Sequence, residues 1–146
     1  MRTTEPITLT PIGHVESRFT EPEPLEEMRR HPSRLVLRPD LAGGLDGLAV
    51  GDWLVVLFYC HRARGYELRQ HPRGDATQPL RGVFALRSPY RPNPIGVTVA
   101  RIEAVEGNVV QVSGLDALDG SPLLDIKPYV SFFDSDSEEC DANASL

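Results

Sequence analysis

Apolar and polar residues partly alternate in short runs along most of the chain, and these runs are rich in Val, Leu, Ile, Phe and Thr. Such alternation with these residue types predicts half-buried β-strands. The sequence Glu106-Gly107-Asn108, between two of the runs, is typical of a hairpin turn. We expect strands at residues 7–15, 34–38, 52–60, 82–86, 96–105, 108–113 and 123–133.

Helical patterns are short, because 13 Pro and 12 Gly are scattered along the chain and interrupt any long helix. The best candidate covers residues 24–30, where two Glu near the start and two Arg at the end suit the helix dipole. A second short helix is expected at residues 39–45. About seven strands with one or two short helices predict an all-β fold, either a barrel or a sandwich.

The length of 146 residues, with 40% hydrophobic and 25% charged content, fits one globular domain. We assign residues 1–133 to this domain and residues 134–146, which begin with five acids in eight positions, to a flexible acidic tail. The longest apolar run, residues 53–59, is too short to span a membrane. The N-terminus has no apolar signal core, so a cytoplasmic protein is expected. Cys60 and Cys140 form no close pair, which favours a free, buried thiol at Cys60.

The net charge of −6 hides an uneven distribution. Residues 53–101 carry eight Arg and two acids, which gives +6, whereas the segments before and after carry −3 and −9. The same middle segment holds six of the ten aromatic residues. A basic surface inside an acidic protein is expected where phosphate or carboxylate groups bind. A solvated, arginine-rich loop is the alternative.

Several common active-site motifs are absent from the sequence. There is no Gly-x-Gly-x-x-Gly after a strand and no P-loop, which excludes the usual nucleotide cradles. The four His and two Cys show no His-x-x-x-His or Cys-x-x-Cys spacing, so no metal is expected. No Gly-x-Ser-x-Gly elbow supplies a nucleophile.

A proline-rich segment at residues 84–96 is stiffer than a barrel requires. Three prolines in six residues hold its backbone extended and remove three amide donors from any sheet. Such a segment can present Arg87, Arg91 and Asn93 to a ligand with little loss of entropy. A rigid crossover between strands is the alternative.

A second unusual segment covers residues 115–129. Asp119 and Gly120 form a tight turn in it, and Asp125 and Lys127 lie two residues apart, so they share one face of a strand. The alternative is a plain turn followed by an ion pair between Asp125 and Lys127.

Together the two segments resemble the TsaA-like (YaeB-like) family, whose characterised members methylate tRNA with S-adenosylmethionine (SAM). The resemblance rests on GVFALRSPYRPNPIG at residues 82–96 and DGSPLLDIKPY at residues 119–129, and it extends over residues 7–130. It implies a single-sheeted β-barrel, a homodimer, and a SAM site unlike the dinucleotide-binding one. It also implies a substrate: N6 of threonylcarbamoyladenosine, just 3′ of the anticodon.

The resemblance also implies particular site residues. Met28-Arg29-Arg30 is the nearest match to the Pro-Arg-Gln element of the family, with Arg in place of Gln. Carried over by position, the expected cofactor-binding residues are Met28, Arg29, Arg30, His61, Arg62, Arg87, Val97, Asp119, Gly120, Ser121 and Pro122. The central expectation is that the proline-rich segment and the Asp119–Gly120 turn close on each other and form one pocket.

The chemistry of methyl transfer suggests roles for some of these residues. An Arg such as Arg87 suits a cofactor carboxylate, and the amides of Gly120 and Ser121 are candidate donors to the cofactor. We expect Asp125 to accept the N6 proton and Lys127 to bind the threonyl carboxylate.

Binding to the single-stranded anticodon loop of tRNA calls for aromatic stacking and arginines. The candidates for contact with the RNA are Arg69, Arg73, Arg91 and Asn93. Two alternatives stay open: a SAM-binding sensor without catalysis, and a methyltransferase with another acceptor.

Overall fold

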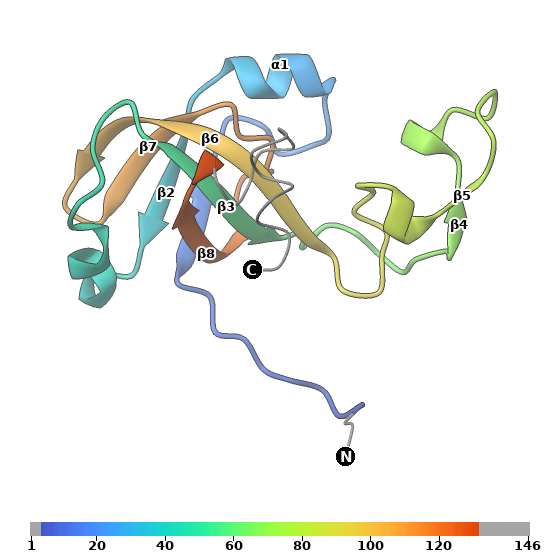
Figure 1. The fold of residues 1–146 in the computed structure, drawn as a ribbon, viewed down its shortest axis with the longest axis horizontal. Coiled ribbons are helices and arrows are strands. Elements are labelled where there is room, and N and C mark those ends of the chain that lie inside the picture. The colour runs from blue at the N-terminus through green and yellow to red at the C-terminus, as the bar shows by residue number, and fades with distance from the viewer. Residues whose placement is uncertain (1–3, 132–146) are drawn as a thin grey trace.

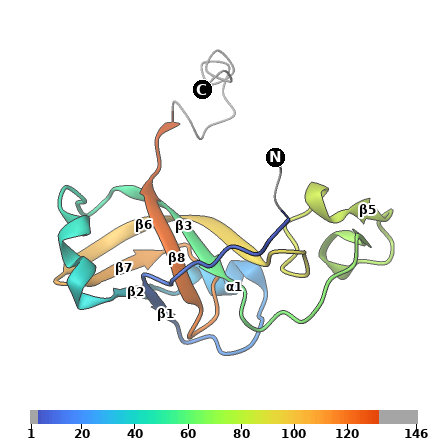
Figure 2. The ribbon, with the colours of Figure 1, turned by 90° about the horizontal axis from the view of Figure 1, so that it is seen from below.

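The structure, a computed structural model, describes residues 4–131. Six antiparallel strands close into a barrel in the order β1-β2-β7-β6-β3-β8 (Figures 1 and 2). The strands are β1 (Gly13–Glu16), β2 (Ser33–Leu37), β3 (Trp53–Tyr59), β6 (Ile95–Glu106), β7 (Val109–Ser113) and β8 (Pro122–Pro128). The expectation of an all-β, single-sheeted barrel with two short helices is confirmed.

Alternation of side chains along the strands builds the barrel core. Leu54, Val56 and Phe58 of β3 point inward and are buried, whereas the residues between them are more exposed. Across the β3–β6 ladder, Leu54 is paired with Ala100, which is also buried. Each buried aliphatic or aromatic side chain contributes about 1.5–3 kcal/mol, so this alternating pattern determines which face of each strand is buried.

Three of the expected strands differ from the observed ones. The strand expected at residues 123–133 ends at Pro128, and residues 132 and 133 lie outside the described residues. Only the end of residues 7–15 is a strand, because Pro11 lacks an amide donor and the chain before it runs along the surface, with Ile7 80% exposed. The expected strand at residues 82–86 is wrong. It is instead a two-residue strand β5 (Arg81–Gly82) and a 3-10 turn η3 (Val83–Ala85), in which the Leu86 amide bonds back to Val83. The barrel therefore has six strands rather than seven.

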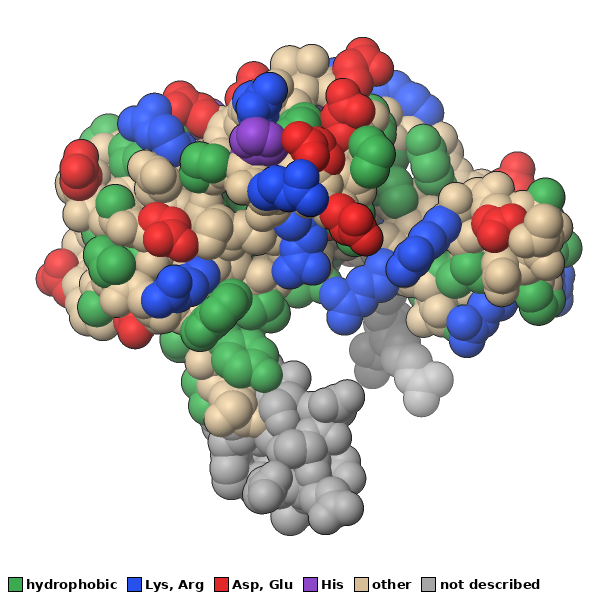
Figure 3. All heavy atoms as spheres, turned by 90° about the horizontal axis from the view of Figure 1, so that it is seen from above, with side chains coloured by type: hydrophobic (Ala, Val, Ile, Leu, Met, Phe, Trp, Pro, Cys, Tyr) green, Lys and Arg blue, Asp and Glu red, His purple; other side chains and the backbone are tan. Residues whose placement is uncertain are grey.

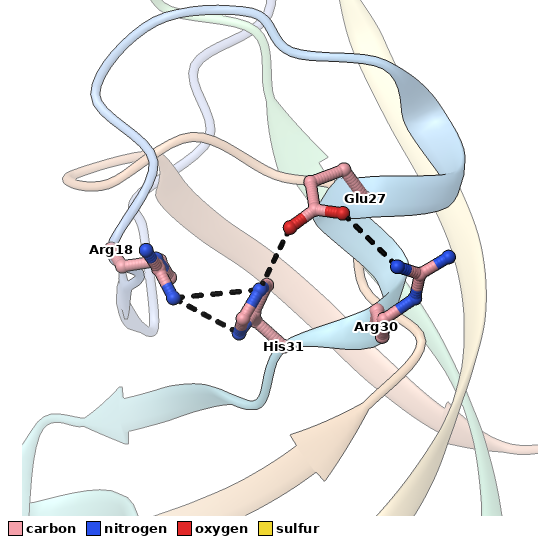
Figure 4. A network of polar contacts seen from close by, with 4 residues as sticks. All are labelled: Arg18, Glu27, Arg30 and His31. Atoms are coloured by element: carbon pink, nitrogen blue, oxygen red, sulfur yellow. Dashed lines mark hydrogen bonds and ion pairs between the residues drawn. The ribbon is translucent and has the colours of Figure 1, made fainter.

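Both expected helices are present and short. Helix α1 (Leu25–Arg30) buries Met28, and the 3-10 helix η1 (Pro39–Leu45) packs Leu45 into the barrel core. A polar network holds the end of α1, where the Glu27 carboxylate bonds to His31 and lies close to Arg30 (Figure 4). The hydrogen bond from His31, which favours the charged carboxylate, lowers the pKa of Glu27.

Residues 61–94 form a lobe that projects from the barrel between β3 and β6 (Figures 1 and 2). Its only sheet is the pair β4 (Arg69–Gln70) and β5, and a 3-10 turn η2 (Pro72–Gly74) lies between them. The lobe contains seven Arg and two acids. Seven of the eight Arg of the basic middle segment, residues 53–101, therefore lie in this one lobe.

The described residues contain no helix with the length and apolar character that crossing a membrane requires. Nor do residues 4–131 bring three His, Cys, Asp or Glu side chains together as a metal site would need. The acidic tail expected at residues 134–146, which includes Cys140, lies outside the described residues.

Candidate functional site

A pocket of about 330 Å³ lies where the lobe joins the barrel, and we call it the junction pocket. Its residues come from the end of β3, from α1 and the loop before it, and from both unusual segments of the sequence. They are Pro22, Met28, Phe58, Cys60, His61, Arg62, Ala63, Pro89, Tyr90, Asp116, Leu118 and Ser121.

The proline-rich segment and the second segment meet at this pocket. The first contributes Pro89 and Tyr90, and the second contributes Leu118 and Ser121. The structure therefore brings together the two stretches that the sequence singled out. The side chains that line the pocket from the proline-rich segment are a proline and a tyrosine, however, and not Arg87.

Backbone hydrogen bonds fix the Asp119–Gly120 turn beside the pocket. The Gly120 amide donates to the Val15 carbonyl at 2.8 Å, and Asp119 Oδ1 accepts a bond from the Ser17 amide at 2.9 Å. Gly120 has a φ of +81°, which favours glycine. The Ser121 amide donates to its own loop, to the carbonyl of Leu118. The amides of Gly120 and Ser121, which were expected to donate to the cofactor, are therefore both used within the protein.

His61 supplies the clearest sign of a ligand. Its Nδ1 is buried and has no hydrogen-bond partner among the described residues. A Cβ added to Gly120 would lie 3.8 Å from its Nε2, so the glycine turn passes against the imidazole. An unpaired buried polar atom costs about 1–3 kcal/mol, and such a cost is commonly tolerated where a ligand completes the bond.

Of the three expected residues on α1, only Met28 lines the pocket. Arg29 donates from Nε to the Gly114 carbonyl at 2.9 Å, and Arg30 pairs with Glu27 at 3.3 Å. Arg29 thus links the helix to the loop after β7, whereas Arg30 pairs with a residue of its own helix.

Arg62 lines the pocket and reaches the loop that precedes α1. Its Nη1 donates to the Thr20 carbonyl at 2.9 Å, and its Nη2 lies 3.6 Å from Glu21 Oε1. A guanidinium has five N–H donors, so these contacts orient Arg62 and leave it donors for an anion.

Only four of the expected cofactor-binding and catalytic residues line the junction pocket: Met28, His61, Arg62 and Ser121. Besides Arg29, Arg30, Asp119 and Gly120, described above, the pocket wall also lacks Arg87, Val97, Pro122, Asp125 and Lys127. Arg87 is exposed in the lobe, and Val97 is 39% exposed on the outer face of β6, where it pairs with Leu57. Leu57 in turn pairs with Asp125. The Asp125 carboxylate accepts an ion pair from Lys127 at 2.9 Å, which is the alternative that the sequence left open. Val97, Asp125 and Lys127 thus lie on the outside of one part of the barrel. Pro122 directly follows Ser121 at the start of β8.

Eight residues of the pocket wall were not among the expected site residues: Pro22, Phe58, Cys60, Ala63, Pro89, Tyr90, Asp116 and Leu118. Asp116 accepts a hydrogen bond from the Thr98 hydroxyl. Burial raises the pKa of the Cys60 thiol, and the nearby Asp116 carboxylate raises it further. No local pattern marks Cys60 or Asp116 as a site residue, because their neighbours in the fold are distant in the sequence.

The candidate RNA contacts lie in and beside the lobe. Arg69 and Arg73 are exposed, and Asn93 is exposed in the turn before β6. Arg91 is half-buried, and its Nη1 donates to the carbonyls of Leu86 at 2.9 Å and Ser88 at 3.2 Å. Lys and Arg side chains gather where the lobe meets the barrel (Figure 3).

A closed antiparallel barrel with a ligand-sized pocket at the end of one strand places the chain among the small β-barrel domains. Comparison with known families identifies it further. The model of the tRNA-methyltransferase O N-terminal domain matches residues 14–135, and the chain belongs to that family.

Curated relatives and solved structures agree with this assignment. The chain is 38% identical over 115 residues to a probable S-adenosyl-L-methionine-binding protein of Methanocaldococcus jannaschii, which covers 76% of this chain and 91% of the relative. It is 45% identical over 84 residues to a mouse tRNA (adenine(37)-N6)-methyltransferase, covering 57% of this chain and 19% of that protein. The crystal structure of TrmO from Pseudomonas aeruginosa superposes with a TM-score of 0.72 at 33% identity, covering 92% of this chain and 60% of the other. This chain therefore spans about three fifths of that solved chain.

Proposed function

We propose that this protein transfers the methyl group of SAM to N6 of threonylcarbamoyladenosine, the modified base just 3′ of the anticodon of tRNA. The observation that carries the proposal is the junction pocket, where the two unusual segments meet beside the unpaired nitrogen of His61. The family and the name of the mouse relative support the same activity. A tRNA acceptor also implies a cytoplasmic reaction.

The junction pocket suits SAM in its size and its lining. Its volume of about 330 Å³ lies within the range of small-molecule pockets. Met28, Phe58 and Tyr90 offer apolar surface, His61 Nδ1 offers an unpaired polar atom, and Arg62 offers a cation for a carboxylate. Bound there, SAM supplies an electrophilic methyl group.

The protein then has to hold the acceptor nitrogen in position and remove its proton. Asp116 is the one acidic side chain among the described residues that line the pocket, and the hydrogen bond from Thr98 fixes its carboxylate. We therefore assign the proton acceptor to Asp116 in place of Asp125. The Asp125 carboxylate instead forms an ion pair with Lys127 on the outer face of the barrel.

Formation of a homodimer would bring the expected site residues that lie outside the junction pocket close to a second subunit. Tyr59, Ile95 and Val97 are 41%, 40% and 39% exposed and form an apolar strip along β3 and β6, next to Asp125. We propose that a second subunit covers this strip. In that arrangement Arg87, Val97, Asp125 and Lys127 contact the tRNA or the pocket of the other subunit. Light scattering tests it, since Val97→Glu should turn a dimer into a monomer and Gln111→Glu, on the exposed face of β7, should not.

A SAM-binding module without catalysis is the second candidate function. Several archaeal relatives are named only as probable S-adenosyl-L-methionine-binding proteins, which favours it. Such a protein would use the same pocket and the same cofactor contacts.

Transfer of a labelled methyl group from SAM to purified tRNA separates these candidates. We expect label in tRNA that carries threonylcarbamoyladenosine and none in tRNA that lacks it. Label in both tRNAs would indicate another acceptor site. SAM binding without any transfer would support the binding module and overturn the proposed activity. His61→Ala should weaken SAM binding in calorimetry, whereas His14→Ala, at an exposed position on β1, should not.

A further inference from the structure

The lobe contains a second pocket, of about 460 Å³, which we call the lobe pocket. It is lined by Arg64, Tyr66, Glu67, Gln70 and Tyr90. Tyr90 also lines the junction pocket. The two pockets are therefore neighbours, and one tyrosine belongs to the wall of both.

Hydrogen bonds fix the walls of the lobe pocket. Gln70 donates from Nε2 to the carbonyl of Glu67 at 2.7 Å and to the carbonyl of Tyr90 at 2.6 Å. Arg64 donates from Nη1 to the carbonyl of His61 at 3.2 Å. Gln70 thus joins strand β4 to the proline-rich segment, and Arg64 joins the lobe pocket to a residue of the junction pocket.

The lining of the lobe pocket fits a nucleotide better than a free anion. Tyr66 and Tyr90 are 54% and 50% exposed, so their rings are accessible for stacking. The Arg64 guanidinium suits a phosphate. The Glu67 carboxylate would repel a phosphate bound in the pocket itself, but it can accept hydrogen bonds from the N–H groups of a base edge.

The charge around the pocket favours RNA as the source of that nucleotide. The lobe carries seven Arg against two acids, and basic side chains gather where it meets the barrel (Figure 3). Single-stranded RNA is bound in this way, by cationic surfaces together with aromatic rings that stack on unpaired bases.

We propose that the lobe pocket binds the base of a nucleotide next to the one that is methylated, with Tyr90 between the two pockets. This inference rests on the proposed tRNA acceptor. It assigns to Arg64, Tyr66 and Glu67 the recognition of the loop sequence beside the target base.

Binding of a fluorescent RNA hairpin with the sequence of an anticodon stem-loop tests the inference. Loss of a base stack costs about 5- to 150-fold in affinity, so Tyr66→Ala should weaken hairpin binding by a factor in that range. Tyr66→Phe keeps the ring and should bind as the wild type does. Phe84→Ala, which removes a 78% exposed ring elsewhere in the lobe, is the matched control and should change nothing. SAM affinity should stay unchanged in all three variants, which also shows that each one is folded.

A set of hairpins with one abasic position each identifies the bound nucleotide. The wild type should bind a hairpin more weakly when the nucleotide next to the target is abasic. The Tyr66→Ala variant should bind that abasic hairpin and the intact hairpin with the same affinity. If Tyr66→Ala binds every hairpin as the wild type does, while the wild type methylates tRNA, the lobe pocket is not a base site and the proposed function stands. If the wild type binds no RNA and methylates none, both proposals are overturned.

Discussion

The Thr98 hydroxyl donates a hydrogen bond to Oδ1 of Asp116 and thereby links strand β6 to the loop between β7 and β8. Thr98 is the partner of the buried Val56 in the antiparallel pairing of β3 and β6, so the barrel itself fixes the position of Thr98. Asp116 also raises the pKa of Cys60, just beyond the end of β3. One carboxylate of the junction pocket is thus held by a hydrogen bond from a strand of the barrel.

Replacing Asp116 by Asn should lower kcat for methyl transfer about 100-fold or more, because general-base catalysis contributes about 10²–10⁴-fold. SAM affinity should change little, since the side chain keeps its shape. Asp125→Asn should raise KM for tRNA and leave kcat nearly unchanged. Steady-state kinetics with threonylcarbamoyl-modified tRNA measures all of these values. A loss of kcat in Asp125→Asn but not in Asp116→Asn would return the role of proton acceptor to Asp125.

The barrel could be predicted from the sequence because strand alternation is a local property. Residues at spacing two along β3 and β6 show which side chains share a face, and burial follows from that. The same rule placed Asp125 and Lys127 on one face. It could not say which face of the barrel this was, because that depends on the register with β3.

The candidate site was predictable only in part. The two unusual segments were identified because their residue types are rare in strands, and they do meet at the junction pocket. Asp116 lies in the second of these segments but was not expected at the site, because its role depends on Thr98, which is 18 residues away in the sequence. The prediction of a strand at residues 82–86 was wrong because an apolar run alone does not make a strand. These residues have no partner strand in the barrel.

Gly96 should be sensitive to a single added methyl group. It pairs with Phe58, and a Cβ at this position would lie 2.5 Å from two atoms of the ring. Gly96→Ala should therefore cost about 1–3 kcal/mol in the free energy of unfolding, as overpacking of a core does. SAM binding should also weaken, because Phe58 lines the junction pocket. Urea denaturation and calorimetry measure the two effects.

The matched control for Gly96→Ala is Gly82→Ala. Gly82 has a φ of −63° and nothing within 4 Å of an added Cβ, so its substitution should change the unfolding free energy by about 0.5 kcal/mol or less. Equal stabilities of the two variants would mean that Phe58 moves aside at no cost.

The network at the end of α1 should stabilise the protein only above acidic pH. The pKa of Glu27 is lowered, mainly by the hydrogen bond from His31 (Figure 4). A carboxyl with a lowered pKa stabilises the folded state above its unfolded value, here 4.5, and this contribution is lost as the pH falls through the folded value. Glu27→Gln should lower the melting temperature at pH 7, and its difference from the wild type should shrink below about pH 4.5. Glu26→Gln removes the same charge one residue earlier without breaking the bond to His31, so a larger effect of Glu27→Gln at pH 7 isolates that bond. A constant difference for Glu27→Gln at all pH values would contradict this role.

Arginines that touch RNA phosphates should be recognisable by the salt dependence of binding. Each phosphate contact adds about 0.7 to the slope of log affinity against log salt for single strands. We expect Arg69→Ala and Arg73→Ala each to reduce the slope by about that amount, since both side chains are exposed on the basic lobe. Arg91→Ala should weaken SAM binding as well, because its Nη1 holds the carbonyls of Leu86 and Ser88 in the proline-rich segment. Arg34→Ala, which breaks an ion pair with Glu16 on the barrel, is the control and should leave the slope as it is. Slopes that do not change in Arg69→Ala and Arg73→Ala would show that the RNA path does not cross this part of the lobe.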